Sequence, residues 1–233
     1  MTVLLHGFWG QPMDWNPVVD RLPLAAPLWI PDLYLGPLGP DKDLEAWTLN
    51  FIEQLHSHAY HQPVQMVGYS MGGRLALNAF LRAPQMFTRV LLLSTMPFLP
   101  QAEHAERARW EAEWSGRFLN EDWATLASAW QEQAVFEGSK SMARRQAPAL
   151  REMLSVGLKN WSVTRHPFGA AEVKALPASL EWAFGALDQK YMARAKQLQE
   201  LSVQGQIEII SNAGHRLLAD APEWISQWIT RGA

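Results

Sequence analysis

The chain has 233 residues, of which 48% are hydrophobic and 18% are charged, and its formal net charge is −3. This composition is typical of one folded globular domain, and the small negative charge gives no reason to expect nucleic acid or a membrane surface as a partner. The sequence has no cysteine, which excludes disulfides, cysteine nucleophiles and thiolate metal ligands. We expect a cytoplasmic protein, because residues 1–7 lack the pattern of a signal peptide and no apolar run reaches the ~18 residues of a membrane span.

The first quarter of the chain alternates apolar runs of strand length with helical patterns. Strands are expected at residues 2–5 and 28–30, and a helix is expected over residues 44–60. Asn16 stands before a proline, which predicts that a short helix begins there with Asn16 as its N-cap. The glycines and prolines of residues 36–40 predict a loop.

The most informative stretch is an apolar run at residues 64–67 that leads into a helical pattern after Ser70. Between them, residues 68–72 read Gly-Tyr-Ser-Met-Gly and fit the G-x-S-x-G motif of a sharp strand-to-helix turn. The glycines prevent collisions where the chain reverses, and the strained backbone of Ser70 presents its hydroxyl. The free N–H of Met71 would face an oxygen that becomes negative nearby. The motif therefore predicts a nucleophilic or basic serine.

Beyond this motif the alternation of strands and helices continues, is interrupted and then resumes. Residues 89–93 form another apolar run, whereas residues 101–174 show only helical patterns and are rich in alanine, tryptophan, arginine and glutamate. Strands are expected again at residues 180–184 and 207–210, and Pro222 opens a last helix.

This order of elements predicts an α/β fold with a mostly parallel sheet and helices on both of its faces. The long helical interruption predicts a cap inserted over the sheet. We therefore expect two units, which are a core of residues 1–100 and 175–233 and a helical cap of residues 101–174.

Two further residues have the positions that a catalytic serine requires. Such a serine needs an imidazole within reach and a carboxylate that fixes the tautomer of that imidazole. Asp188 and His215 each lie in a loop that follows a predicted strand, and functional sites gather at these ends of parallel strands. Ser70, Asp188 and His215 follow one another in the chain order of the α/β-hydrolase triad. Three alternatives stay open, because Asp188 could cap a helix, His215 could be exposed, and Asp32 could orient the histidine instead.

The loop after the first strand offers a second donor for a negative oxygen. Residues 6–8 read His-Gly-Phe and resemble the loop that provides an oxyanion N–H in this kind of fold, here from Phe8 or Trp9. The alternative is an ordinary glycine turn between a strand and a helix.

We expect no metal site and no cofactor. The sequence has one cluster of histidines, and their spacing does not place them on one face of a helix. These residues are His56, His58 and His61.

Arginines point to an anionic small molecule as the partner. Arg74 lies one helical turn after Ser70, where a guanidinium is costly unless it is paired or meets an anionic ligand. The predicted cap supplies Arg107, Arg109, Arg117, Arg144, Arg145 and Arg151. For each of these the alternative is a solvated helix face.

The chain resembles the α/β-hydrolases and, within them, the family of 2-succinyl-6-hydroxy-2,4-cyclohexadiene-1-carboxylate synthases, the pyruvate-eliminating lyases of menaquinone biosynthesis. The generic part of the resemblance is the His-Gly-Phe loop, the serine motif, Asp188 and the Ala-Gly-His sequence that ends at His215. The specific part is Arg74 directly after two glycines, together with stretches of the cap. These stretches are Ala105-Glu106-Arg107, Trp114–Leu119, Trp130 with Gln133–Phe136, and Ala149-Leu150-Arg151.

Three departures from the family are present. Residues 32–36 read Asp-Leu-Tyr-Leu-Gly and lack the family's usual Gly-His-Gly turn. His215 is followed by Arg216 where the family tends to carry asparagine or threonine. The family's N-terminal hairpin has no counterpart before the first strand, so we expect a sheet with fewer strands.

The resemblance implies roles for ten residues. Ser70, Asp188 and His215 would be catalytic, and Phe8 and Met71 would form the oxyanion hole. The residues that would bind the substrate are Tyr69, Arg74, Arg107, Trp130 and Arg151. The implied reaction is proton abstraction followed by expulsion of pyruvate from an anionic cyclohexene dicarboxylate. The alternative enzyme is a serine carboxylesterase or thioesterase with an acyl-serine intermediate, and a non-catalytic ligand-binding module is the alternative of another class.

Overall fold

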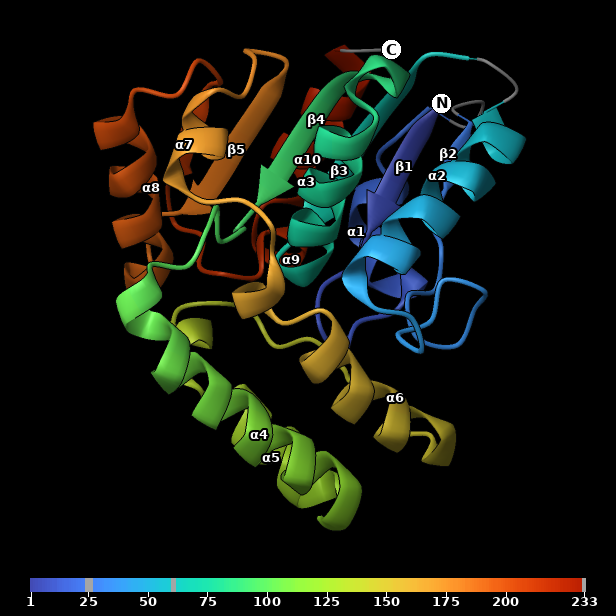
Figure 1. The fold of residues 1–233 in the computed structure, drawn as a ribbon, viewed down its shortest axis with the longest axis vertical. Helices are drawn as coiled ribbons and strands as arrows, with labels where there is room; N and C mark the ends of the chain where they lie inside the picture. The colour runs from blue at the N-terminus through green and yellow to red at the C-terminus, as the bar shows by residue number, and fades with distance from the viewer. Residues whose placement is uncertain (24–26, 60–61, 232–233) are drawn as a thin grey trace.

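The computed structural model describes residues 1–23, 27–59 and 62–231, and it contains a central sheet with helices on both faces and a helical cap (Figure 1). Six strands pair in the order β2-β1-β3-β4-β5-β6, and each of the five pairings is parallel. Their bounds are β1 Thr2–Leu5, β2 Leu28–Trp29, β3 Val64–Tyr69, β4 Phe87–Leu93, β5 Leu180–Gly185 and β6 Ile207–Ile210. The predicted α/β architecture is confirmed.

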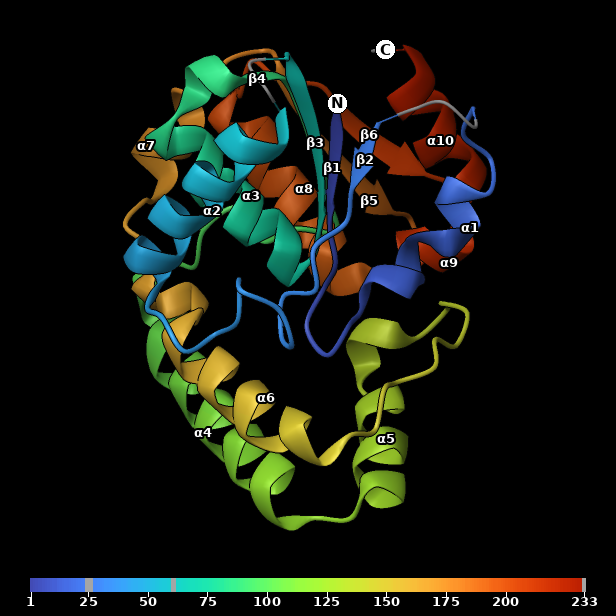
Figure 2. The same ribbon diagram turned by 90° about the vertical axis from the view of Figure 1, so that its right-hand side faces the viewer.

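Two buried clusters account for the apolar strand sequences. Along β4, Val90 and Leu92 belong to one cluster, whereas Leu91 and Leu93 belong to the other. Successive side chains of a strand point to opposite faces, so a sheet that is covered on both sides requires nearly continuous apolar runs. Figure 2 shows these two layers of helices. One contains α2 Leu44–Ala59, α3 Met71–Arg82 and α8 Gln189–Leu201, and the other contains α1 Asn16–Val19, α9 Leu217–Asp220 and α10 Pro222–Arg231.

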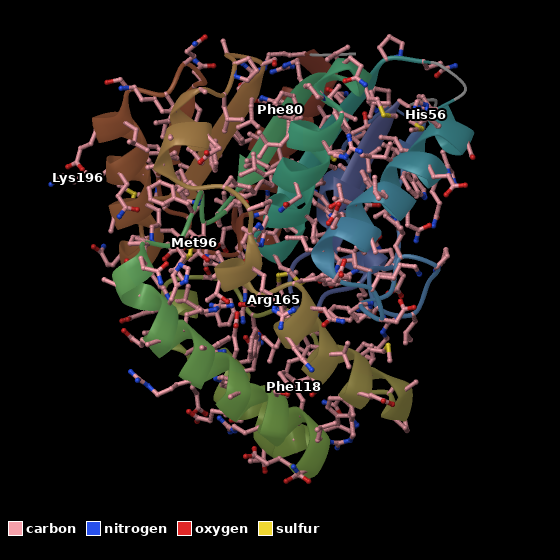
Figure 3. The ribbon with its side chains drawn as sticks, viewed as in Figure 1. His56, Phe80, Met96, Phe118, Arg165 and Lys196 are labelled. Atoms are coloured by element: carbon pink, nitrogen blue, oxygen red, sulfur yellow. The ribbon has the colours of Figure 1, made fainter. Side chains whose placement is uncertain are left out.

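The cap lies beyond the carboxyl ends of the strands (Figures 1 and 2). It is built from α4 His104–Asn120, α5 Trp123–Gln131 and α6 Pro148–Asn160. Aromatic rings fill its interior, where the ring centroid of Phe118, labelled in Figure 3, lies 5.9 Å from those of Trp114 and Trp130. The short helix α7, Ala170–Lys174, falls within the predicted cap range but lies beside α8 and the sheet.

Some predicted boundaries differ from the structure. Asn16 is the first residue of α1 and not its N-cap, because a 3-10 turn over Pro12–Trp15 already brings the chain into helical geometry. β4 begins at Phe87, two residues before the predicted strand. The predicted helix end at Tyr60 lies outside the described residues, and so does His61.

Searches of the described residues for a metal site and for a membrane span were negative. No group of three or more histidine, aspartate or glutamate side chains in this part of the chain could hold a metal ion. His58 instead stacks on Trp29, with 4.3 Å between the ring centroids. None of the helices described is long and apolar enough to cross a membrane.

The turn between β3 and α3 is packed directly against β1. A Cβ atom at Gly72 would lie 2.4 Å from the His6 carbonyl oxygen and 2.5 Å from that of Leu5. A Cβ atom at Gly68 would lie 2.6 Å from the Gly72 carbonyl oxygen. All three distances are far shorter than van der Waals contact, so the predicted need for glycine at these two positions is confirmed.

We predict that Gly72→Ala lowers the free energy of unfolding by about 2 kcal/mol or more, because the added methyl group pushes α3 away from β1. Gly116→Ala is the matched control, since a Cβ atom at Gly116 in α4 meets nothing within 4 Å. This control should be neutral or more stable than the wild type by about 0.5–1 kcal/mol. Urea unfolding compares the three proteins, and equal stabilities for the two variants would contradict the close approach.

Candidate active site

Ser70, His215 and Asp188 form one hydrogen-bonded chain. Ser70 occupies the turn before α3 with φ of 53° and ψ of −111°, the strained conformation expected of the serine in such a turn. His215 Nε2 lies 3.1 Å from Ser70 Oγ, and His215 Nδ1 lies 2.6 Å from Asp188 Oδ2. A carboxylate accepts the Nδ1–H proton, so the Nε2 lone pair faces the serine hydroxyl. In this geometry His215 could act as a general base that takes the Ser70 hydroxyl proton. The serine oxygen could then act either as a nucleophile or as a base toward a substrate.

Contacts in the structure distinguish the alternatives for the carboxylate that orients His215. Asp188 both orients His215 and caps α8, because its second oxygen accepts a hydrogen bond from the Tyr191 N–H at 3.1 Å. Asp32 is engaged elsewhere, with its carboxylate 2.8 Å from an Arg145 Nη atom. Burial raises the pKa of Asp32, but hydrogen bonds from Arg145 and from backbone N–H groups outweigh it and hold that pKa below its usual value. His215 itself is buried, not an exposed loop residue.

Phe8 and Met71 are the two predicted N–H donors for a negative oxygen beside Ser70. Both residues line the cavity that contains Ser70. Within the described chain, neither N–H donates a hydrogen bond to another residue. The N–H of Met71 is free because it belongs to the first turn of α3. These two donors could bind an oxyanion that develops beside Ser70.

His6 holds the loop that carries Phe8. Its ring is fully buried, and Nε2 lies 3.0 Å from the Leu33 backbone nitrogen, while Nδ1 lies 2.9 Å from the Gly7 carbonyl oxygen. The Leu33 N–H can only donate, so the ring carries its proton on Nδ1 and donates it to Gly7. Burial lowers the pKa of His6 to about 4, which keeps it neutral. The sequence motifs assigned His6 no role of its own, although its position directly after a buried strand was a usable signal.

A cavity of about 680 Å³ opens between the ends of the strands and the cap. Its floor contains Ser70 and His215, and its walls are mainly aromatic and aliphatic. The aromatic walls come from Phe8, Trp110, Trp130, Phe136, Trp161 and Tyr191. The charged residues that line it are Arg74, Arg107 and Lys190 together with Glu103, Glu106, Glu111 and Glu137. The aromatic walls suit a ring-shaped molecule, and the arginines could bind negative groups on it.

The five residues with an implied substrate role lie in different places. Arg74, Arg107 and Trp130 line the cavity, whereas Tyr69 and Arg151 are not among its lining residues. Tyr69 is buried below the site, with its ring centroid 5.6 Å from that of His215. Arg107 pairs with Glu111 at 2.6 Å.

Arg151 instead fastens the cap helices to one another. Its guanidinium donates to the carbonyl oxygens of Phe118 at 2.9 Å and Glu121 at 2.6 Å, and it stacks over Trp123 at 4.3 Å. These contacts join α6 to the end of α4 and the start of α5.

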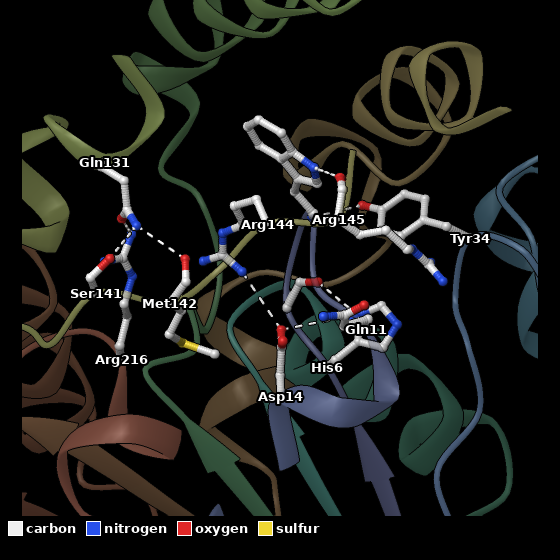
Figure 4. Close-up of polar contacts among 12 residues, drawn as sticks. His6, Gln11, Asp14, Tyr34, Gln131, Ser141, Met142, Arg144, Arg145 and Arg216 are labelled. Atoms are coloured by element: carbon white, nitrogen blue, oxygen red, sulfur yellow. Dashed lines mark hydrogen bonds and ion pairs between the residues drawn. The ribbon is translucent and has the colours of Figure 1, made fainter. Parts of the chain in front are cut away.

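The segment 137–147, which we call the strap, connects the cap to three loops of the core (Figure 4). Arg145 forms two hydrogen bonds with Asp32, at 2.8 and 3.2 Å. Arg144 is buried and lies 3.6 Å from Asp14, whose pKa is raised by burial despite the positive neighbour. From the sequence, these two arginines were identified only as part of the arginine-rich cap. Their partners could not be predicted, because no local pattern identifies side chains that lie far away in the sequence.

Arg216, which follows His215 directly, joins the strap to the loop that carries this histidine. Its guanidinium stacks on Phe136 at 3.9 Å and donates to the Lys140 carbonyl oxygen at 3.2 Å, and it also hydrogen-bonds Gln131. Burial and the nearby Arg144 lower the pKa of Arg216 to about 10, so it stays charged at neutral pH. At this position the chain departs from the family pattern, and the structure uses the arginine to hold the strap.

Comparison with known proteins identifies the family of the chain. The model of the alpha/beta hydrolase family matches residues 2–228. The chain belongs to this family.

Among curated relatives of this α/β hydrolase are two proteins named 2-succinyl-6-hydroxy-2,4-cyclohexadiene-1-carboxylate synthase. The protein from Enterobacter sp. (strain 638) is 28% identical over 94% of this chain and 86% of its own length. The protein from Klebsiella pneumoniae is 29% identical over 94% of this chain and 88% of its own length. The family resemblance read from the sequence is confirmed.

Solved structures share the fold of this α/β hydrolase. MenH from S. aureus superimposes with a TM-score of 0.87 at 18% identity, covering 99% of this chain and 91% of that protein. The carboxylesterase CesB from Bacillus subtilis superimposes with a TM-score of 0.65, also at 18% identity, covering 98% and 81% of the two chains. At these identities the likeness shows the fold alone.

We predict that His6 makes this α/β hydrolase less stable in acid. As the pH falls below 6.5, the ordinary pKa of histidine, the unfolded chain takes up a proton that folded His6 refuses until about pH 4. The free energy of unfolding should therefore fall by up to ~3 kcal/mol across this window on account of His6 alone. Urea unfolding at about pH 7 and about pH 4.5 measures the loss.

The variant His6→Asn should be less stable at neutral pH and should lose less stability on acidification than the wild type. His56→Asn is the control, because His56 is exposed on α2 (Figure 3). An identical loss of stability in His6→Asn and the wild type would contradict the assignment.

Proposed function

We propose that this protein is a lyase that eliminates pyruvate from an anionic cyclohexene dicarboxylate, as 2-succinyl-6-hydroxy-2,4-cyclohexadiene-1-carboxylate synthase does in menaquinone biosynthesis. The observation that carries the proposal is Arg74, a buried guanidinium in the same cavity as Ser70 with no carboxylate partner among the described residues. The names of its curated relatives support the choice of reaction.

The position of Arg74 favours a negatively charged group of the substrate at this end of a cavity that is also lined by four glutamates. Burial and the neighbouring Arg107 lower the pKa of Arg74 to about 10, so the guanidinium is still charged at neutral pH. A buried cation without a counter-ion is costly, and a substrate carboxylate would relieve that cost. Arg107 is already paired with Glu111, so Arg74 is the stronger anion site of the two. The aromatic walls would pack against the ring that carries the carboxylates.

The proposed reaction begins with proton transfer at Ser70. His215 takes the hydroxyl proton, and the serine oxygen removes a proton from a ring carbon of the substrate. The electron pair moves onto a substrate oxygen that accepts hydrogen bonds from the N–H groups of Phe8 and Met71. The C–O bond to the enolpyruvyl group then breaks, the ring gains a double bond, and the departing group becomes pyruvate on protonation. Water is not consumed, and Asp188 holds the imidazolium that forms.

We predict that the wild type releases pyruvate from the 5-enolpyruvyl precursor of the menaquinone pathway and that two substitutions abolish or weaken this release. Ser70→Ala should lower kcat by about 1,000-fold or more, because it removes the relayed base. Arg74→Lys should lower kcat/KM at least tenfold, because an ammonium cannot reproduce the planar two-point contact of a guanidinium with a carboxylate. Coupling pyruvate to lactate dehydrogenase gives the rates.

Arg109→Lys is the matched control for Arg74→Lys, because Arg109 is exposed on α4 and does not line the cavity. Its kinetics should equal those of the wild type. Near-normal kinetics for Arg74→Lys would contradict the role of Arg74 in binding an anion.

A serine esterase uses the same three side chains, so the experiment must separate the two chemistries. If no pyruvate appears while an activated aryl ester gives a Ser70-dependent burst of acyl-enzyme, the protein is a carboxylesterase or thioesterase. If a serine-reactive phosphonate leaves Ser70 unlabelled and no turnover occurs, the cavity binds a ligand without catalysis.

A further inference from the structure

Arg74 is held in place by neutral groups. One of its terminal nitrogens, Nη1, donates to the Trp161 carbonyl oxygen at 2.7 Å and lies 2.9 Å from Nε2 of His166. The ion pairs formed by residues 1–23, 27–59 and 62–231 do not include Arg74. Most buried arginines are positioned by a carboxylate, which also cancels their charge. Here neutral acceptors orient the guanidinium, and Glu111, the carboxylate that acts on its charge from a distance, is paired with Arg107.

His166 reaches Arg74 from the joint between the cap and the core. It follows the short turn Val163–Arg165, which comes after the cap helix α6 and before α7, and Arg165 is labelled in Figure 3. The other ring nitrogen, Nδ1, lies 2.8 Å from the side-chain amide of Asn78, one turn further along α3. The same end of the Asn78 amide lies 2.8 Å from the Arg74 carbonyl oxygen. The imidazole thus bridges two side chains of α3 whose positions determine where the guanidinium points.

The protonation state of His166 follows from its partners. A guanidinium has only donors, so Nε2 must offer its lone pair and a neutral ring carries its proton on Nδ1. The Asn78 side chain must then present its amide oxygen to Nδ1–H, because an amide NH2 group can only donate. A second proton on Nε2 would bring two positive charges within hydrogen-bonding distance of each other. Burial, Arg74 and Arg107 all lower the pKa of His166 well below its usual value. The charged groups near this contact are Arg74 from α3 and the Arg107–Glu111 pair from α4.

We propose that His166 is a positioning residue for the anion site: its neutral imidazole, together with the Trp161 carbonyl, fixes the Arg74 guanidinium toward the cavity and leaves its full charge to a substrate carboxylate. This inference rests on the proposed function, because it requires an anionic substrate. Histidine suits the position because it accepts a hydrogen bond without carrying a negative charge, whereas aspartate or glutamate would neutralise Arg74 and compete with the substrate.

The first test compares two side chains of nearly equal size at this position. His166→Gln retains a neutral acceptor, and its KM for the enolpyruvyl precursor should stay within about threefold of the wild type. His166→Glu places a carboxylate on Arg74, and its KM should rise by about tenfold or more with a smaller change in kcat, because the lost interaction is with a part of the substrate that does not react. Melting temperatures within a few degrees of the wild type exclude unfolding as the cause. Equal KM values for the two variants would overturn the proposal.

The second test needs no substrate and therefore separates this inference from the proposed function. Histidine side-chain ¹⁵N NMR on the intact protein should show His166 as the neutral Nδ1–H tautomer from about pH 8 to about pH 5.5. In Arg74→Gln the positive neighbour is gone, so the pKa of His166 should rise and its resonance should begin to titrate in this range. An Nε2–H tautomer, or titration near the ordinary pKa in the wild type, would overturn the proposal even if pyruvate is released. The expected spectrum in a protein that releases no pyruvate would support the arrangement of His166 and Arg74 while the lyase reaction fails.

Discussion

The close packing of the turn at Ser70 against β1 determines how the rest of the site is built. Because Gly72 touches the carbonyl oxygens at the end of β1, the loop that follows β1 must pass directly beside the serine. That loop carries Phe8, so the two free N–H groups beside Ser70 come from segments more than sixty residues apart in the sequence yet adjacent in the sheet. His6 fixes the start of this loop by accepting a hydrogen bond from the Leu33 N–H. One steric constraint therefore places both Ser70 and the two N–H groups at the same cavity.

Arginine serves two different purposes in this protein that composition alone cannot distinguish. Arg151 and Arg145 satisfy their guanidinium groups within the protein, on backbone carbonyls in one case and on Asp32 in the other. Arg74, in the core, has only neutral acceptors within the described part of the chain. The free energy that the protein loses by burying this cation is available to a ligand that brings a negative charge. Neutral acceptors alone do not set Arg74 apart, because Arg151 also donates to backbone carbonyls. Arg74 differs in that its side chain lines the cavity that contains Ser70.

The features that could be predicted from the sequence are those that depend on local sequence pattern and on the order of the strands. Strand ends bring loop residues to one edge of a parallel sheet, so Ser70, Asp188 and His215 could be grouped from the order of strands and motifs alone. Contacts between distant segments could not be predicted, because no local signal links His166 to a side chain 92 positions away. The orientation of the cap helices could not be predicted either, because it depends on how their aromatic rings pack. Arg151 was therefore given a substrate role from the family resemblance, whereas the structure does not place it among the residues that line the cavity. The prediction that Asn16 is an N-cap was wrong for a simpler reason, because the preceding 3-10 turn had already brought the chain into helical geometry.

The strap gives the cap and His215 a common support. Arg216 follows His215 directly and holds the strap through Phe136 and Lys140. If a ligand moves the strap and His215 together, linkage requires that the position of His215 changes the affinity for that ligand by the same free energy. Through this shared support the cap contacts the segment that carries His215 and does more than cover the cavity.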